Sequence, residues 1–183
     1  MLGLPYPGGP VLDRLAKEGN PGAYTWPIPQ LGNEAYSFSG LKTSVLYYLT
    51  KHKPNLEDCQ ESDLRDLCAS IQSTVVESLM RPVIHHAGLK KPRSLGLAGG
   101  VAANSLLRSR IMALGEQLGC QVHIPPMSWC TDNAAMIAAS ARILLDHGKV
   151  PQEAMAQKPL PRWPLMEYLR ELSVLNLGQE GGS

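Results

Sequence analysis

Apolar residues recur at helical spacing in several stretches of the chain. The longest stretch begins near Ser62, which we expect to cap a helix that Asp63 supports electrostatically, and it ends at Gly88. Its apolar positions lie three or four residues apart and are Leu64, Leu67, Ile71, Val75, Leu79 and Val83. Pro82 falls inside this pattern and predicts either a kink or the last turns of the helix.

A second helical stripe is followed by a glycine, the residue that most often ends a helix. The stripe consists of Leu107, Ile111, Leu114 and Leu118, and Gly119 comes directly after it. An Ala-rich stretch predicts another helix over residues 133–147, with Asp132 as its N-cap and Gly148 at its end. We expect shorter helices over residues 11–17 and 41–51.

Three short segments have the character of strands. Residues 94–98 (SLGLA) run into a glycine pair, and residues 121–124 (QVHI) are closed by two prolines. Residues 34–40 (EAYSFSG) place Tyr36 and Phe38 two positions apart, as in a half-buried strand. The order strand, glycine turn, helix, strand, turn, helix is typical of an α/β layer, in which ligands bind beyond the carboxyl ends of the strands.

Composition and charge narrow the class of protein. The chain has 183 residues, 44% hydrophobic and 18% charged, which indicates a soluble globular protein of one domain or half of a larger protein. A formal net charge of +1 neither supports nor excludes an RNA partner. The start of the chain resembles neither a signal peptide nor a transit peptide, so we expect a cytoplasmic protein without membrane contact. No C-x-x-C pair occurs, and we expect reduced thiols at Cys59, Cys68, Cys120 and Cys130.

Two segments carry the most distinctive candidate chemistry. In AGGVAAN (residues 98–104), Gly99 and Gly100 would let backbone approach a ligand closely, and Asn104 opens the following helix; spacing alone equally fits a tight turn without a ligand. In CTDNAAMIA (residues 130–138), Asp132 fits an N-cap or a metal ligand. The five histidines form neither an H-x-x-x-H nor an H-E-x-x-H pair that would complete a metal site.

Two further segments combine glycines with polar side chains. In PGGPVLD (residues 7–13), Gly8 and Gly9 can approach a sugar and Asp13 can accept hydrogen bonds from ribose hydroxyls, or the segment is an ordinary turn before a helix. In SFSGLKT (residues 37–43), hydroxyls and Lys42 can bind a ligand or simply start a helix. Basic residues that can touch RNA, or form solvated surface, are Lys90, Lys91, Arg93, Arg108 and Arg110.

The order and wording of five motifs resemble one family. PYPGGP, SFSGLKT, AGGVAAN, CTDNAAMIA and PRWPL, spread from about Leu2 to Leu165, are similar to motifs of the bacterial tRNA N6-adenosine threonylcarbamoyltransferases, formerly labelled O-sialoglycoprotein endopeptidases. The resemblance implies an α/β fold of the actin-like, Hsp70-like ATPase type, built from ribonuclease-H-like lobes. It covers only the C-terminal half of the family, so we expect a nucleotide-binding portion over residues 1–165, a tail over residues 166–183, and a missing N-terminal lobe.

The activity implied by this resemblance is a tRNA modification. Family members transfer a threonylcarbamoyl group from threonylcarbamoyl-AMP to N6 of the adenosine that follows the anticodon, in tRNAs reading codons that begin with A. Their partners are tRNA, a non-catalytic paralogue (TsaB-like) and a small ATPase (TsaE-like). A non-catalytic lobe that binds a partner protein, a metalloendopeptidase and a phosphotransferase of the same fold are the alternative interpretations.

The resemblance also implies roles for individual residues. Gly9 matches a position that contacts the adenylate, Asp13 matches a ribose-contacting aspartate, and Asn104 contacts the nucleotide beside Gly99 and Gly100. Asp132 matches the third ligand of a divalent metal, iron or zinc, whose histidine ligands this chain does not contain. No catalytic residue is assigned in this half, and we expect the chain alone to bind nucleotide weakly and to transfer nothing.

Overall fold

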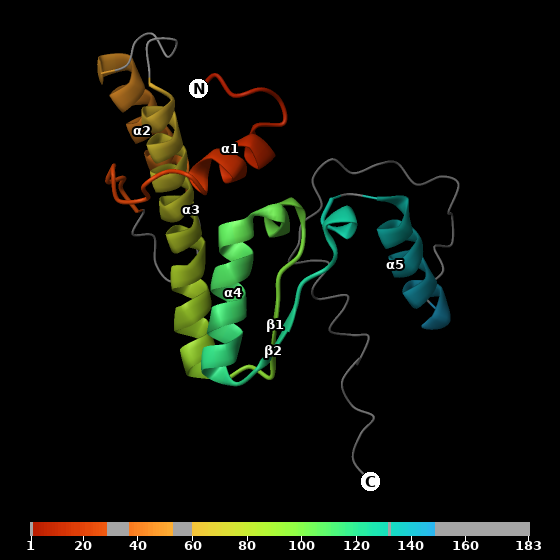
Figure 1. Cartoon of the computed structure of the whole chain (residues 1–183). Coiled ribbons are helices and arrows are strands. Elements are labelled where there is room, and N and C mark those ends of the chain that lie inside the picture. The colour runs from red at the N-terminus through yellow and green to blue at the C-terminus, as the bar shows by residue number, and fades with distance from the viewer. Residues whose placement is uncertain (1, 29–36, 53–59, 132, 149–183) are drawn as a thin grey trace. The chain divides into compact units, whose positions relative to one another are not determined.

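The structure is a computed structural model that describes residues 2–28, 37–52, 60–131 and 133–148. The chain divides into two compact units, residues 1–132 and 133–183. The first contains the helices α1 (Gly8–Ala16), α2 (Ser39–His52), α3 (Glu61–Lys90) and α4 (Ser105–Leu118) (Figure 1). Two single turns of 3-10 helix, η2 (Gly100–Ala103) and η3 (Met127–Trp129), flank the end of the sheet. The second unit contains α5 (Ala134–Asp146).

A small parallel sheet confirms the α/β class of the described chain. Strands β1 (Ser94–Gly96) and β2 (Gln121–His123) pair in parallel, with Leu95 opposite Val122. Helix α4 connects them, which is the connection that parallel strands require. Gly119 ends α4 with φ of 64°, as its position after the apolar stripe predicts. The two strands, α4 and its glycine stop therefore match the sequence analysis closely.

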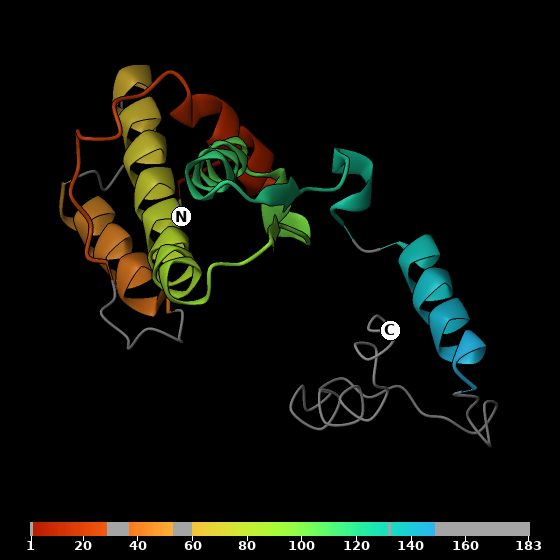
Figure 2. The same ribbon diagram turned by 90° about the horizontal axis from the view of Figure 1, so that it is seen from below.

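Helix α3 is shared by two hydrophobic clusters and lies between α2 and α4 (Figure 2). Its first half packs on α2 and on Trp26, in a cluster of Trp26, Leu41, Val45, Leu49 and Leu67. Its second half packs on α4, in a cluster of Val76, Met80, Leu107, Ile111 and Leu114. Trp26 Nε1 also donates to Ser70 Oγ (3.0 Å) inside the core. Pro82 lies in the last turns of α3, as one of the two sequence interpretations has it.

Several predicted boundaries are wrong. Residues 37–40 form no strand: the Phe38 carbonyl already accepts the Lys42 N–H (2.9 Å), and α2 begins at Ser39, while Tyr36 lies outside the described residues. The N-cap of α3 is Gln60 rather than Ser62. Helix α1 begins at Gly8, three residues before the predicted start. The helices themselves are predicted, but each begins two or three residues before its expected start, because residue pattern fixes the position of a helix better than its ends.

The cap of α5 is also corrected. Asn133, not Asp132, is the N-cap, and its Oδ1 accepts the Met136 N–H (3.0 Å). Asparagine and aspartate cap helices about equally well, so the pattern alone could not choose between neighbours. Among the helices described, none combines the length and the apolar character that crossing a bilayer requires. The described cysteines Cys68, Cys120 and Cys130 are free thiols, and Cys59 lies outside the described residues.

Candidate functional site

Asp13 is the point at which three helices of the first unit meet. Its Oδ1 accepts hydrogen bonds from the Ser105 backbone N–H (2.9 Å), the Ser105 hydroxyl (2.9 Å) and the Gln72 side-chain amide (2.9 Å). These donors belong to α4 and α3, whereas Asp13 belongs to α1. Helix α1 contains no fully buried residue, and these hydrogen bonds join it to the other two helices.

The environment of Asp13 favours its charged form. Burial by itself raises the pKa of the Asp13 carboxyl group. The hydrogen bonds from Ser105 and Gln72, together with the positive charge of Lys17, outweigh burial and hold that pKa below its ordinary value. Lys17 Nζ lies 3.4 Å from Asp13 Oδ2, the carboxylate oxygen that accepts none of these three hydrogen bonds. Asp13 is therefore an ionised acceptor, as a ribose-contacting residue would have to be.

Asn104 is the N-cap of α4 and is tied to Asp13 through one intervening residue. Its Oδ1 accepts the Leu107 N–H (2.9 Å), and Gln72 Nε2 lies 3.4 Å from the same oxygen. Gln72 Nε2 thus joins the side chains of Asp13 and Asn104. The structure brings together two residues that the sequence places 91 positions apart.

The glycines of the candidate site leave the backbone open. Gly99 and Gly100 follow β1, are exposed, and lead through η2 to Asn104. Gly99 has a φ angle of 78°, a backbone conformation that residues other than glycine rarely adopt. A Cβ added at Gly99, Gly100 or Gly9 would meet no atom within 4 Å. Gly9 lies in the first turn of α1, one turn before Asp13, rather than in a free turn.

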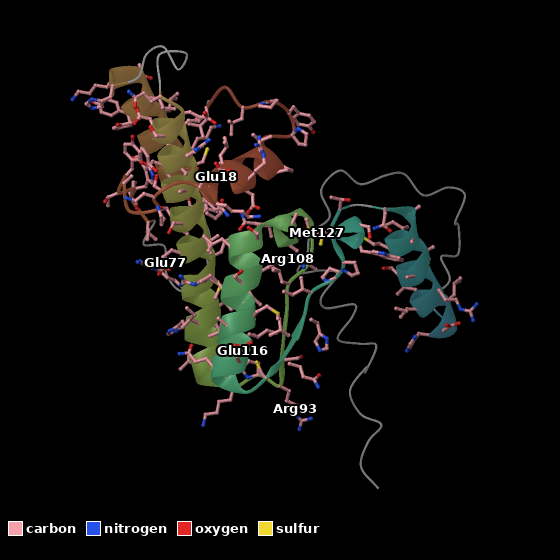
Figure 3. The ribbon with its side chains drawn as sticks, viewed as in Figure 1. Glu18, Glu77, Arg93, Arg108, Glu116 and Met127 are labelled. Atoms are coloured by element: carbon pink, nitrogen blue, oxygen red, sulfur yellow. The ribbon has the colours of Figure 1, made fainter. Side chains whose placement is uncertain are left out.

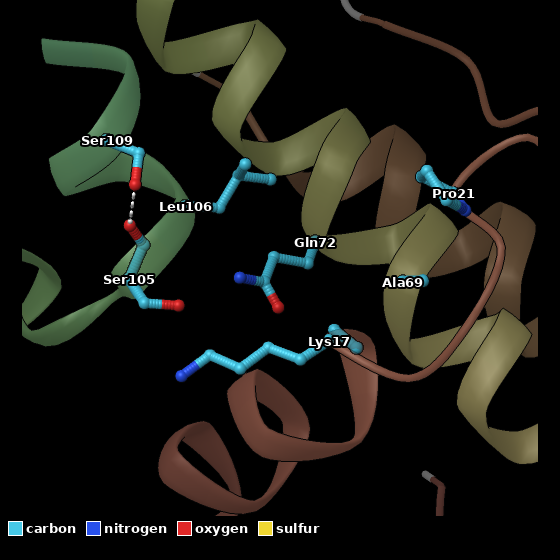
Figure 4. A pocket seen from close by; sticks show the side chains of 8 residues that line it. Lys17, Pro21, Ala69, Gln72, Ser105, Leu106 and Ser109 are labelled. Carbon is cyan, nitrogen blue, oxygen red and sulfur yellow. Dashed lines mark hydrogen bonds between the residues drawn. The ribbon is translucent and has the colours of Figure 1, made fainter.

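A cavity of about 240 Å³ lies beside this network, between α1, α3 and α4 (Figure 4). Its lining combines apolar and polar residues, which are Ala16, Pro21, Ala69, Leu106, Lys17, Gln72, Ser105 and Ser109. In the close view, the Gln72 side chain extends toward the space between Ser105 and Lys17. The Ser109 hydroxyl donates to the Ser105 carbonyl (3.1 Å) and is thereby oriented along α4.

Arg108 holds the segment that follows β2 against η2. Its guanidinium donates to the carbonyls of Ala102 and Pro125, the latter at 2.9 Å, and lies 3.3 Å from Cys130 Sγ. Figure 3 shows Arg108 between α4 and the turn that contains Met127. Arg108 is therefore not a freely solvated cation, because its guanidinium binds backbone carbonyls within the fold. Arg110, of the same basic group, pairs with Glu77 at 3.2 Å.

The candidate metal ligand Asp132 lies outside the described residues. Among the residues that the structure does describe, no group of three or more His, Cys, Asp and Glu side chains could hold a metal ion. A lone carboxylate does not supply the ligand number that iron or zinc needs. The described residues therefore do not fit a complete metal site.

The SFSGLKT segment forms the start of α2. The Thr43 hydroxyl donates to the Ser39 carbonyl (3.0 Å), one turn earlier in α2, and Lys42 is exposed. These contacts are those of an ordinary helix start. The segment is not joined to the Asp13 network by any of the hydrogen bonds described above.

Gln72 and Ser105 were not identified by sequence reasoning. Gln72 lies on the line Cys68, Gln72, Val76 and Met80, whose members are four residues apart and all buried. A single polar residue on a buried line of a helix is the signal that points to Gln72, because buried polar groups need partners. Ser105 follows the helix cap directly, where a hydroxyl is common, and no pattern marks it.

Comparison with known proteins gives a consistent result. The sequence model of the family described as tRNA N6-adenosine threonylcarbamoyltransferase matches residues 1–139. Curated proteins of that name are 43% identical in Chlorobium phaeobacteroides (83% of this chain, 45% of the relative) and 42% identical in Polaromonas naphthalenivorans (93% and 49%). One from Moorella thermoacetica is 47% identical (77% and 41%). The chain thus spans about half the length of the curated relatives that it matches.

Proposed function

Because this chain belongs to the tRNA N6-adenosine threonylcarbamoyltransferase family, we propose that it supplies the nucleotide-binding part of such an enzyme. The observation that carries the proposal is the link from Asp13 through Gln72 to Asn104, since two of the predicted nucleotide contacts share one hydrogen-bonded network. Residues 1–165 would form the nucleotide-binding portion of an actin-like ATPase fold. The small parallel sheet and its helices are compatible with a ribonuclease-H-like lobe.

The residues of this chain would bind and orient threonylcarbamoyl-AMP. The ribose would lie against Asp13 and Gly9, and the base or ribose against Asn104. The open backbone of Gly99 and Gly100 would let the phosphate region approach closely, since no Cβ stands in the way. Holding the adenylate in one orientation would place its carbamoyl carbon for attack, which is a contribution by positioning.

The reaction would be an acyl transfer to a tRNA base. The N6 nitrogen of the adenosine that follows the anticodon attacks the carbamoyl carbon, the bond from that carbon to the phosphate oxygen breaks, and AMP leaves while N6 loses a proton. The family implies iron or zinc for this step, with Asp132 as one ligand. Because the described residues do not fit a complete metal site, we assign binding and positioning alone to this chain.

The remaining half of the enzyme and its partners are part of the proposal. The chain spans 41–49% of the relatives named above, and the histidine ligands of the metal would come from the part that it does not span. We expect tRNA, a TsaB-like paralogue and a TsaE-like ATPase as partners, in the cytoplasm. The chain alone would bind nucleotide weakly and would transfer nothing.

One observation favours the alternative of a partner-binding lobe. Helix α5 contains no buried residue, and its exposed apolar side chains include Met136, Ile137, Ile143 and Leu145. Such side chains on one helix fit a surface that is covered by another protein or by another part of the complete enzyme. Failure of the chain to bind nucleotide, combined with tight binding to a paralogue, would favour this function over the first.

The proposal is tested by titrating the chain with AMP and with a non-hydrolysable threonylcarbamoyl-AMP analogue, followed by NMR because weak binding is expected. Asn104→Ser keeps a side chain that can cap α4 but removes the amide, and we expect at least a tenfold loss of affinity. Asn133→Ser makes the same change at the cap of α5 and should leave binding unchanged. Equal affinities of wild type and Asn104→Ser would remove Asn104 from the site.

A further inference from the structure

Gln72 is a buried polar residue that none of the five sequence motifs contains. It lies in the middle of α3, and only 4% of its surface is exposed. Its neighbours one turn away on the same line of the helix, Cys68 and Val76, belong to the buried interior. A long amide side chain in such a place is unusual unless both of its ends are used.

The hydrogen bonds around Gln72 fix the orientation of its amide. Its two near neighbours are Asp13 Oδ1, which is a carboxylate oxygen, and Asn104 Oδ1, which accepts the Leu107 N–H as the helix cap. Both oxygens are acceptors, so the Gln72 NH₂ group must face them. Reversal of the amide would set its oxygen against those two oxygens, which excludes the opposite assignment. The Gln72 carbonyl therefore has to point elsewhere.

The Gln72 carbonyl oxygen is buried and forms no hydrogen bond within the described residues. An unpaired buried acceptor is unfavourable, and in folded proteins such a group usually has a partner. Gln72 also lines the cavity of about 240 Å³ described above, beside Lys17 and Ser105 (Figure 4). A hydrogen-bond donor that enters this cavity would come next to the residue whose carbonyl oxygen has no partner.

We propose that Gln72 is a positioning and specificity residue of the nucleotide site: its amide nitrogen holds Asp13 and Asn104 together, and its carbonyl oxygen accepts a hydrogen bond from a ribose hydroxyl of the bound nucleotide. This inference rests on the proposed function, since it names the same ligand. A ribose hydroxyl is the donor that the site calls for, because Gln72 bonds directly to Asp13, the proposed ribose contact. The ligand class is therefore a nucleoside 5′-phosphate with an intact ribose diol.

The two roles of Gln72 can be measured separately in the full chain. Gln72→Met keeps the length and volume of the side chain and removes both its donor and its acceptor. Without ligand, we expect the pKa of Asp13, followed by carboxyl ¹³C NMR, to rise in this variant because one donor to its oxygen is lost. With ligand, we expect AMP affinity to fall at least tenfold, and the preference for AMP over 2′,3′-dideoxy-AMP to shrink by a similar factor.

The test also uses a matched control variant and an NMR measurement on the wild-type chain. Gln117→Met makes the same change at an exposed position of α4 and should alter neither quantity. In the wild type, the ¹³C signal of the Gln72 carbonyl should move on saturation with AMP and move less with 2′,3′-dideoxy-AMP. This second readout does not depend on whether Gln72→Met folds.

The outcomes distinguish this inference from the proposed function. If the wild type and Gln72→Met bind AMP equally well, the role of Gln72 is overturned while the proposed function stands. The same holds if the wild type binds AMP but the Gln72 carbonyl signal does not move. An unchanged Asp13 pKa in the variant would overturn the positioning role. Failure of the wild type to bind AMP at all would contradict the proposed function and this inference together.

Discussion

Removal of the Asp13 carboxylate should detach α1 from the two helices that it contacts. Asp13→Ala takes away the acceptor of three hydrogen bonds, from the Ser105 backbone, the Ser105 hydroxyl and Gln72. Hydrogen bonds to charged groups contribute about 1.5–3 kcal/mol each. The two Ser105 donors are only partly buried and regain water, whereas Gln72 is buried. With about 1 kcal/mol allowed for each bond, the free energy of unfolding should fall by about 3 kcal/mol. Asp13→Asn keeps the shape without the charge and should lose about half as much.

Urea unfolding followed by far-UV circular dichroism measures this loss. With a slope of about 2 kcal/mol per molar urea, Asp13→Ala should shift the midpoint by about 1.5 M. Asp146→Ala is the control, since Asp146 is an exposed carboxylate on α5 that pairs with Arg142 at 2.9 Å, and it should cost under about 0.5 kcal/mol. Hydrogen exchange should show the loss first in α1. An Asp13→Ala protein as stable as the control would refute the role assigned to the network.

Three further predictions follow from single contacts. Because the pKa of Asp13 is lowered in the folded state, its carboxylate contributes stability that is lost as the pH falls below about 4. The stability difference between wild type and Asp13→Asn should therefore be smaller at pH 3 than at pH 7, and an equal difference at both would contradict this. Gly115→Ala would drive a methyl group into the Val122 side chain and should lower stability by about 2 kcal/mol. Gly88→Ala meets open space and should not lower stability, and equal melting temperatures of the two variants would exclude the clash. Trp26→Phe removes the donor to Ser70 and should lower the urea midpoint, and an unchanged midpoint would show that this bond contributes nothing.

The elements that sequence pattern predicts well are those with strong local signals at both ends. Helix α4 has an asparagine cap at Asn104 and a left-handed glycine at Gly119. Three members of its apolar stripe, Leu107, Ile111 and Leu114, belong to one cluster. Strand β2 is bounded by prolines on its far side. The strand predicted over residues 34–40 rests on the spacing of only two aromatic residues. The first hydrogen bond of α2 already forms at the Phe38 carbonyl, so a helix begins there instead.

The sequence names two residues of the candidate site, but it does not show what connects them. Asp13 and Asn104 follow from motif resemblance, yet only the fold shows that Gln72 joins them, because that contact depends on how α1 and α4 pack on α3. The contacts of Arg108 could not be predicted from the sequence for the same reason. Its partners are the backbone carbonyls of Ala102 and Pro125. Every residue has such a carbonyl, so the sequence does not indicate which ones accept a hydrogen bond.

The most direct test of the central claim is a chimera with the Moorella thermoacetica relative. This chain would replace the 143 residues that it matches there, and the binding of a non-hydrolysable threonylcarbamoyl-AMP analogue would be measured by calorimetry beside the unaltered relative. We predict that the folded chimera binds the analogue with an affinity within about tenfold of the relative, or about 1.4 kcal/mol. A folded chimera that does not bind, while the relative does, would contradict the claim that this chain is a nucleotide-binding half.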